Sequence, residues 1–269
     1  MTSATTGTTQ NLASIDGQTI HIATMSDLVA RTVARCKAGL GFTLYTLNMD
    51  HLVKRRVDPA FRDVYARATF VTADGAPLVW LARRQGVRLE RTTGADLLEP
   101  LCKAAAQEGI PVALFGSSTD SLQLAARILR LQFPGLDICH IEAPRQGFDP
   151  KSREAEAAME RISASGARFC FVALGAPKQE MFSDHMAAKF PHVGFFGIGA
   201  AVDFVSGAQT RAPLFFQYNG LEWLWRLGPN PGRLAARYLR CAGVLAHLVL
   251  IEPLRRRLFG PVFGKSMGG

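Results

Sequence analysis

Short apolar runs alternate with longer stretches of helical periodicity through most of the chain. Short runs rich in β-branched and aromatic residues are typical of buried strands, whereas apolar residues that recur every three or four positions indicate amphipathic helices. The predicted strands are residues 18–23, 42–48, 70–73, 111–115, 137–143, 168–174 and 193–198. The predicted helices are residues 26–38, 60–66, 77–85, 94–108, 118–132, 151–165 and 178–189.

This alternation predicts an α/β fold of the Rossmann-like type, with a largely parallel sheet and helices on both of its faces. The first fifteen residues are rich in Thr and Ser and hold no apolar run, so we expect a disordered tail and not a secretory signal. The composition of the sequence changes after Ser206-Gly207, where aromatic and basic residues become frequent. We therefore divide the chain into a tail (1–15), an α/β domain (16–206) and a C-terminal appendage (207–269).

Positive charge is concentrated in the appendage. The chain has 31 basic and 22 acidic residues, which gives a net charge of +9. From Arg211 to the end there are nine basic residues, and only Glu222 and Glu252 oppose them. Such a cluster favours an anionic partner, which can be a phosphate group, a nucleic acid or an acidic membrane surface.

The same appendage is rich in aromatic side chains. They crowd into residues 215–227, and an Arg-rich helical stretch follows from Arg233 to about Ile251. The apolar part of that stretch, residues 241–251, is only eleven residues long, whereas a membrane-spanning helix needs about twenty. The pattern favours a helix that lies in the membrane interface. The alternative is an amphipathic core helix with a solvated basic face.

Several site motifs are missing from the sequence. No G-x-G-x-x-G fingerprint follows the first predicted strand, and there is no P-loop. There is also no D-x-D carboxylate pair and no cluster of His and Cys, so neither a metal site nor a cofactor is predicted. The five cysteines are widely scattered, which indicates reduced thiols and not a disulfide framework.

Asp74 follows the predicted strand 70–73 and begins a glycine turn. Ligands of open α/β sheets bind at the carboxyl ends of the strands, where an Asp can act as a general base. Asp-Gly is also a very common turn dipeptide, so a purely structural role is the alternative.

Other polar residues lie at neighbouring strand ends. Thr46 and Asn48 close the second predicted strand, and Arg91 precedes a helix, where its guanidinium could clamp an anionic or hydroxyl-rich ligand. Gln179 lies in a first helical turn, where backbone N–H groups are free to meet a phosphate, and Gly199 lets backbone approach a ligand closely. Each also has a structural explanation, as a turn former, a surface ion pair or a helix cap. Their joint position on one edge of the sheet favours a binding site.

Blocks of sequence spread along the chain resemble the WecG/TagA/CpsF family of bacterial glycosyltransferases. The resemblance runs, in order, from about residue 18 to about residue 240. The matching blocks are residues 46–51, 73–77, 90–97, 174–180, 197–200 with Phe204 and Gly207, 211–213 and 220–227, followed by Pro231, Arg233 and Arg237-Tyr238. The Pro-Lys-Gln-Glu block and the pair Arg-Ala-Pro and Gly-Leu-Glu-Trp make this resemblance specific.

The resemblance implies transfer of a sugar from a UDP-sugar to a saccharide carried on undecaprenyl diphosphate, in the synthesis of cell-surface polysaccharide. It also implies inversion at the anomeric carbon without a required metal, which is consistent with the missing D-x-D. By the same resemblance, Asp74 is the candidate base for the acceptor hydroxyl. Thr46, Asn48, Arg91 and Gln179 then line the pocket for the donor sugar and the acceptor.

The resemblance also gives the appendage a role, in which arginines cover the active site and the segment docks on the membrane. Arg226 and Arg233 match positions suited to the UDP diphosphate, and Arg211 is expected to join them. The next arginine of the family pattern falls at Arg237 or, one residue away, at Ala236. We expect a peripheral protein on the inner, cytoplasmic face of the cell membrane.

Two functions of other classes remain open from the residues themselves. One is a nucleotide-binding sensor or scaffold at the membrane surface that uses this fold without chemistry. The other is a basic nucleic-acid-binding module, which we rank low because the chain holds no nucleic-acid motif. Within the resemblance, the donor sugar can be N-acetylmannosamine, its uronic acid or glucose, and the sequence does not separate them.

Overall fold

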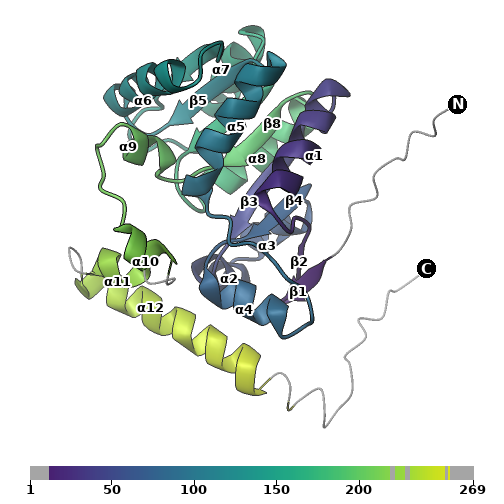
Figure 1. Ribbon diagram of the computed structural model, residues 1–269, viewed down its shortest axis with the longest axis vertical. Coiled ribbons are helices and arrows are strands. Elements are labelled where there is room, and N and C mark those ends of the chain that lie inside the picture. Colours follow the sequence, from purple (N-terminus) through teal and green to yellow (C-terminus); the bar gives the residue numbers. More distant parts are fainter. Residues whose placement is uncertain (1–11, 219–221, 228–230, 252–253, 255–269) are drawn as a thin grey trace, which may run out of the picture.

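A six-stranded parallel sheet forms the centre of the protein (Figure 1). The computed structural model describes residues 12–218, 222–227, 231–251 and 254. The strand order is β4-β3-β8-β7-β5-β6, and all neighbouring strands run parallel. The strands are β3 (Phe42–Leu47), β4 (Phe70–Ala73), β5 (Val112–Gly116), β6 (Ile138–Glu142), β7 (Phe169–Ala173) and β8 (Gly194–Gly197). The predicted α/β fold with a largely parallel sheet is confirmed.

Burial explains why these strands read as continuous apolar runs. Every residue of β3, β4, β5, β7 and β8 is buried, as expected for parallel strands that are covered on both faces. Phe42, Phe169 and Phe196 come from three adjacent strands and pack with ring centroids 5.0–6.0 Å apart. Aromatic contacts of this kind add to the free energy gained from area burial. β6 lies at the edge of the sheet and is mostly half-buried.

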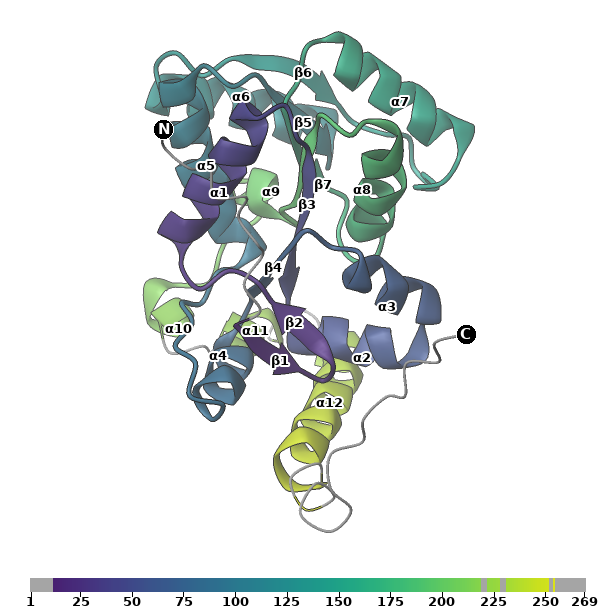
Figure 2. The same ribbon diagram turned by 90° about the vertical axis from the view of Figure 1, so that its right-hand side faces the viewer.

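Helices cover both faces of the sheet (Figure 2). One face carries α1 (Met25–Lys37), α5 (Gly94–Glu108), α6 (Thr119–Gln132) and α9 (Ala201–Val205). The other carries α2 (Met49–Val57), α3 (Pro59–Ala66), α7 (Arg153–Ala164) and α8 (Lys178–Lys189). Polar N-caps set several starting points: the side chains of Asn48, Thr93 and Ser118 each accept a hydrogen bond from a first-turn amide.

The chain leaves two neighbouring strands toward opposite faces of the sheet. β3 is followed by α2 on one face, whereas β8, its neighbour, is followed by α9 on the other. The carboxyl ends of β3 and β8 therefore form a topological switch point, which is where open α/β sheets bind their ligands. The backbone topology alone therefore predicts a ligand site at the carboxyl ends of β3 and β8.

The N-terminal part of the domain differs from the prediction. The predicted strand 18–23 is not part of the main sheet, because β2 (Gln18–Ile20) pairs antiparallel with β1 (Ala13–Ile15) in a separate hairpin. Its turn uses Asp16 and Gly17, both at positive φ, which Asp and Gly tolerate best. β1 lies within the segment expected to be a tail, and residues 1–11 lie outside the described residues. Helix α4 (Ala76–Arg83) packs beside this hairpin.

The C-terminal segment is helical and lies across one end of the domain (Figure 1). It contains α10 (Leu214–Tyr218), α11 (Glu222–Leu227) and α12 (Pro231–Ala246), which continues as the π-helical turn η1 (His247–Ile251). α12 packs along α2, and a stripe of its apolar side chains faces the core beneath the hairpin. That stripe consists of Cys241, Val244 and Leu245 of α12 and continues with Leu248 of η1.

The apolar part of this helix is longer than the sequence indicated. Residues Leu234–Ile251 form 18 helical residues with a mean hydropathy of 1.5, so length and composition alone permit a membrane span. The argument that eleven apolar residues are too short to span is therefore wrong for the folded helix, since helix continuity adds the turns that contain Arg237 and Arg240. The core contacts of α12 nevertheless hold one of its faces on the protein.

Candidate functional site

Asp74 and Asn48 lie side by side at the carboxyl edge of the sheet. β3 and β4 pair in register up to Leu47 and Ala73, so the next residues of both strands emerge at the same edge. The Asp74 N–H donates to the Leu47 carbonyl at 2.7 Å, and Asn48 Nδ2 donates to Asp74 Oδ2 at 3.2 Å. A half-buried carboxylate is thereby held by a neutral donor.

The orientation of the Asn48 amide is fixed by the start of α2. Its Oδ1 accepts a hydrogen bond from the His51 N–H at 3.0 Å, which caps the helix. The amide nitrogen therefore faces Asp74. Helix capping and the positioning of the candidate base depend on the same side chain.

A buried polar layer lies beneath this pair. Thr46 is buried in β3, and its carbonyl accepts a hydrogen bond from the Tyr65 hydroxyl at 3.5 Å. His51 Nδ1 lies 2.7 Å from the same hydroxyl. Burial, with the positive charge of Lys54 nearby, lowers the pKa of His51 to about 3, so its ring is neutral near pH 7. His51 therefore supports the site as a neutral hydrogen-bonding group.

Gln179 connects the ends of β7 and β8. It lies buried in the first turn of α8, and its Oε1 accepts a hydrogen bond from the Gly199 N–H at 3.0 Å. Gly199 has a φ of +55°, and a Cβ at Gly197 would lie only 2.9 Å from Gln179 Nε2. Gly197 therefore lets this amide approach the end of β8, the strand beside β3, and Gly199 adopts a left-handed conformation that Gly tolerates best.

Glu180 is a buried acid whose position we did not anticipate. Its Oε1 accepts a hydrogen bond from Gln179 Nε2 at 2.8 Å, and its Oε2 has no hydrogen-bond partner among the described residues. Burial raises the pKa of Glu180 to about 7. Its place in the Pro-Lys-Gln-Glu block was the one sequence feature that pointed to this residue.

Arg91 and Arg211 form a compact ion-pair cluster with Asp96 and Glu222. Arg91 lies 3.2 Å from Glu222 and 3.8 Å from Asp96, and Arg211 lies 2.5 Å from Asp96 and 3.6 Å from Glu222. Asp96 belongs to the first turn of α5 and Glu222 to α11, so the cluster joins the C-terminal segment to the domain. Both arginines, expected to meet substrate, are paired with carboxylates here.

The remaining predicted arginines lie on α11 and α12. Arg237 pairs with Asp50 in the first turn of α2, with Nε 3.0 Å from Oδ1. Burial alone would raise the pKa of Asp50, but the hydrogen bond from Lys54 and the charge of Arg237 hold it below its ordinary value. The side chains of Arg226 and Arg233 lie outside the described residues, so their predicted contact with the diphosphate stays a prediction.

A second polar contact at this edge was missed by the sequence reasoning. Ser117 follows β5 at a φ of +45°, and its hydroxyl donates to Asp203 of α9. Gln209 Nε2 also donates to Asp203, at 2.8 Å, and so fastens the loop that leads to Arg211. The local sequence Gly116-Ser117-Ser118 is accounted for by the start of α6, which Ser118 caps, so it did not point to Asp203. In the described part of the chain, no three His, Cys, Asp or Glu side chains gather as metal ligands.

A comparison with protein families gives this arrangement a context. The model of the "Glycosyl transferase WecG/TagA/CpsF family" matches residues 13–258 of the 269-residue chain. The match covers most of the chain, from the hairpin to the C-terminal segment. The chain therefore belongs to this family, and its activity is that of a glycosyltransferase.

Burial of Glu180 leads to a testable pH dependence of stability. The ordinary pKa of a Glu carboxyl is 4.5, and that of folded Glu180 is about 7. Between these pH values the folded protein retains a proton that the unfolded chain has lost, so the stabilisation is complete below pH 4.5 and is lost as the pH rises through 7. We expect the free energy of unfolding of the wild type to fall, relative to Glu180→Gln, by on the order of 3 kcal/mol between pH 4.5 and 8.

Urea unfolding at a series of pH values measures this difference. His51 contributes an opposite slope below pH 6.5, but this slope is common to both proteins and cancels in the comparison. Glu160→Gln, a change of an exposed Glu on α7, is the matched control and should follow the wild type at every pH. If wild-type and Glu180→Gln curves run parallel from pH 4.5 to 8, Glu180 does not titrate as described.

Proposed function

We propose that this glycosyltransferase moves a sugar from a UDP-sugar to a saccharide on undecaprenyl diphosphate, with inversion and without a metal ion. The observation that carries the proposal is the pairing of Asp74 with Asn48 at the switch point of the sheet. A carboxylate at the carboxyl edge of an open α/β sheet lies where such sheets bind their ligands, which supports a role as general base. Family membership supplies the reaction class, and the substrates are our inference.

The proposed reaction is one displacement. Asp74 accepts the proton of the acceptor hydroxyl while that oxygen attacks the anomeric carbon of the donor. The bond between this carbon and the diphosphate oxygen breaks, and UDP leaves with the bonding electrons. A single attack from the opposite side inverts the configuration. Asn48, which donates to one oxygen of Asp74, keeps the carboxylate oriented toward its substrate.

The remaining polar residues of this edge are proposed to hold the donor sugar and the acceptor. Thr46 belongs to β3 and Asn48 follows it as the cap of α2, whereas Gln179 and Gly199 lie beyond β7 and β8. Glu180 fixes the amide of Gln179, so its hydrogen-bonding groups are oriented before substrate arrives. Such preorganisation lowers the free-energy cost of binding in the reactive geometry.

Arginines take the place of a metal in stabilising the leaving diphosphate. Arg91 and Arg211 lie in one cluster, and their carboxylate partners are Asp96 and Glu222. A diphosphate carries more negative charge than a carboxylate and accepts the same bidentate hydrogen bonds, so it can exchange for these partners. Arg226, Arg233 and Arg237 of the same segment are proposed to complete this cationic surface.

The C-terminal segment is proposed to seat the enzyme on the cytoplasmic face of the membrane. α10, α11, α12 and η1 expose large apolar side chains beside the basic residues of the segment. The exposed set is Leu214, Phe215, Trp223, Leu224, Trp225, Leu239, Leu250, Ile251 and Leu254. Aromatic and aliphatic side chains next to arginines suit a membrane interface. Since the opposite stripe of α12 packs on the domain, we favour a helix that lies on the membrane.

Replacing the candidate base tests the reaction. We expect Asp74→Asn to slow sugar transfer at least a hundredfold, because general-base catalysis contributes about 10²–10⁴-fold. Asn retains an oxygen that can accept from Asn48, so the unfolding midpoint and UDP affinity should stay close to the wild type. The measurement is UDP release from a panel of UDP-sugars in the presence of a short-chain lipid-diphosphate saccharide.

Asp137→Asn, a change of an exposed Asp before β6, is the matched control and should leave transfer unchanged. Near-normal turnover of Asp74→Asn would exclude the proposed base. Nucleotide binding without UDP release from any donor in the wild type would instead favour the sensor or scaffold.

Removing apolar side chains from the exposed face of α12 and η1 tests membrane docking. We expect Leu239→Gln, Leu250→Gln and Ile251→Gln together to weaken binding to phosphatidylglycerol vesicles by at least tenfold. Each side chain contributes about 1 kcal/mol when it is half-buried in the interface. Co-sedimentation with vesicles measures the change.

The matched control is Leu131→Gln on α6, which replaces a leucine that is 82% exposed and far from the segment in sequence. It should leave vesicle binding unchanged. Unchanged binding of the triple variant would show that this face of α12 does not dock.

A further inference from the structure

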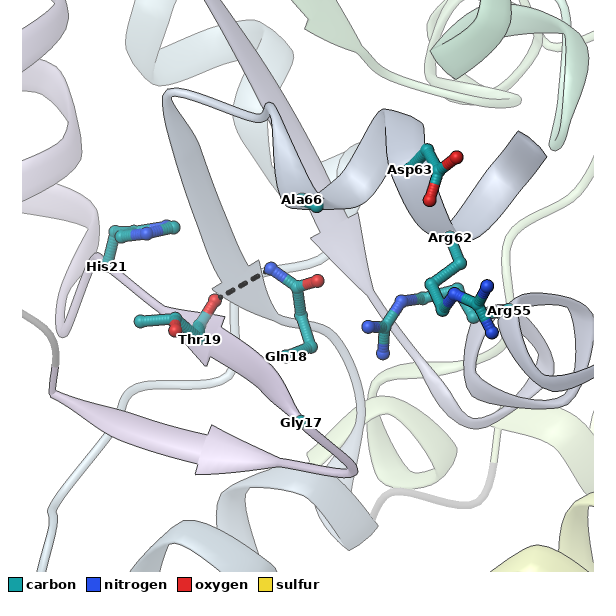
Figure 3. Close-up of a pocket in the computed structure, with 8 residues that line it drawn as sticks. All are labelled: Gly17, Gln18, Thr19, His21, Arg55, Arg62, Asp63 and Ala66. Carbon is teal, nitrogen blue, oxygen red and sulfur yellow. Dashed lines mark hydrogen bonds between the residues drawn. The ribbon is translucent and has the colours of Figure 1, made fainter. Parts of the chain in front are cut away.

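A groove on the domain is lined by residues other than those of the candidate active site. It has a volume of about 370 Å³ and lies between the N-terminal hairpin and helices α2 and α3 (Figure 3). It is lined by Gly17, Gln18, Thr19, His21, Arg55, Arg62, Asp63 and Ala66. None of these residues belongs to the carboxyl edge that carries Asp74, and the volume falls within the range of small-molecule sites.

Arg55 is an uncompensated cation in the wall of this groove. Its side chain comes from α2, and the residue is only 6% exposed. Neither Nε nor Nη1 has a hydrogen-bond partner among the described residues. Its guanidinium carbon lies 5.7 Å from the centre of the Tyr65 ring, a contact that attracts the cation without satisfying its N–H groups. A buried charge in this condition is costly unless an anion joins it.

The acidic side chain nearest to Arg55 on the hairpin is committed elsewhere. Asp16 holds Arg56 through two hydrogen bonds, both 2.7 Å long. Its charge favours the cationic form of Arg55, yet burial still lowers the pKa of Arg55. Among the described residues, Asp16 therefore acts on Arg55 only through its charge, and no carboxylate forms an ion pair with Arg55.

The rest of the groove offers donors and a second cation. Arg62 projects from α3 on the same side as Arg55 (Figure 3), and Asp63 is the one carboxylate among the eight lining residues. Gln18 Nε2 donates to the carbonyls of Thr19 and Tyr65. His21 Nδ1 accepts from the Val71 N–H, and burial lowers the pKa of His21, so the neutral ring carries its proton on Nε2. The lining is therefore cationic overall and rich in N–H groups.

We propose that this groove binds the phosphate group of an organic phosphate, held by Arg55 and Arg62. Guanidinium groups bind phosphate oxygens through paired hydrogen bonds, and the volume of the groove accommodates an organic part in addition. The site is separate from the one that binds the donor nucleotide.

The groove lies close to the C-terminal segment, so its ligand can be a membrane phospholipid or a soluble phosphate ester. Arg56, adjacent to Arg55, lies with its Nη2 3.3 Å from His247 Nδ1 at the start of η1. The exposed residues Leu250 and Ile251 follow in the same turn. A phospholipid headgroup and a soluble phosphate ester present the same chemistry, so the experiment separates these two sources.

Titration of the full chain with glycerol 1-phosphate tests the site directly. Calorimetry at constant ionic strength, with saturating UDP present to occupy the nucleotide site, should show binding by the wild type. We expect Arg55→Met, which keeps the bulk and removes the charge, to weaken that binding at least tenfold. Arg127→Met, an exposed residue on α6, is the matched control and should bind as the wild type does.

Unfolding midpoints show whether Arg55 has only a structural role. Removing an uncompensated buried charge should leave the midpoint of Arg55→Met equal or higher in phosphate-free buffer, while glycerol 1-phosphate should stabilise only the wild type. If Arg55→Met fails to fold, the exposed Arg62→Met replaces it and should also weaken binding several-fold. Equal binding by wild type and variants, or no binding by the wild type, would overturn the proposal.

Vesicles identify the source of the phosphate. If the ligand is a lipid headgroup, Arg55→Met should weaken binding to phosphatidylglycerol vesicles. The variant should also lose the preference that the wild type shows for phosphatidylglycerol over phosphatidylcholine. If the ligand is a soluble ester, the variant should lose glycerol 1-phosphate binding and keep full vesicle binding. Both results support the phosphate site, and neither depends on the outcome for Asp74.

Discussion

The parallel register of β3 with β4 and β8 brings the polar residues of the candidate site to one edge of the sheet. Because all three strands end at one edge, Asn48, Asp74 and Gly199 emerge together, although they are far apart in the sequence. The direction of the chain then differs between neighbours, since β3 leads to α2 on one face and β8 to α9 on the other. Helices α2 and α9 therefore leave the sheet toward opposite faces at the edge where Asn48, Asp74 and Gly199 lie.

Charged pairs, in addition to apolar contacts, attach the C-terminal segment near this edge. Arg91, Arg211, Asp96 and Glu222 join α5 to α11, and Arg237 joins α12 to Asp50 of α2. Ion pairs of partly buried side chains contribute little net free energy, since desolvation opposes their attraction. An anionic substrate can therefore compete for the same arginines at low cost. In the proposed reaction, diphosphate binding to these arginines is thereby coupled to the position of the C-terminal segment.

The main features of the fold and site could be predicted because they have local signatures. Alternating apolar runs identified each strand of the main sheet. The rule that ligands bind at the carboxyl ends of such strands then selected Asp74, Asn48 and Thr46. Gln179 and Gly199 were also predicted, and they form a direct hydrogen bond. The hairpin could not be placed from pattern alone, because two three-residue strands carry too little periodicity to reveal their partner.

Long-range polar contacts had no local signature either. Arg91 and Glu222 lie 131 positions apart, and Ser117 and Asp203 lie 86 apart, so only the folded chain reveals these pairings. Glu180 lies in the first turn of α8, a position that usually faces solvent, but the packing of α8 on the sheet buries it. Sequence reasoning thus placed the candidate residues at one edge of the sheet, whereas tertiary packing determined which charges are paired, buried or exposed.

The central claim is that sugar transfer takes place at the edge formed by β3, β4 and β8. A crystal structure with a UDP-sugar and an unreactive lipid-diphosphate acceptor analogue tests it most directly. The account predicts the anomeric carbon beside Asp74, the acceptor hydroxyl position within hydrogen-bond reach of its carboxylate, and the diphosphate against arginines of the C-terminal segment. A donor bound elsewhere on the protein, with Asp74 beyond reach of the acceptor even through one water, would contradict it.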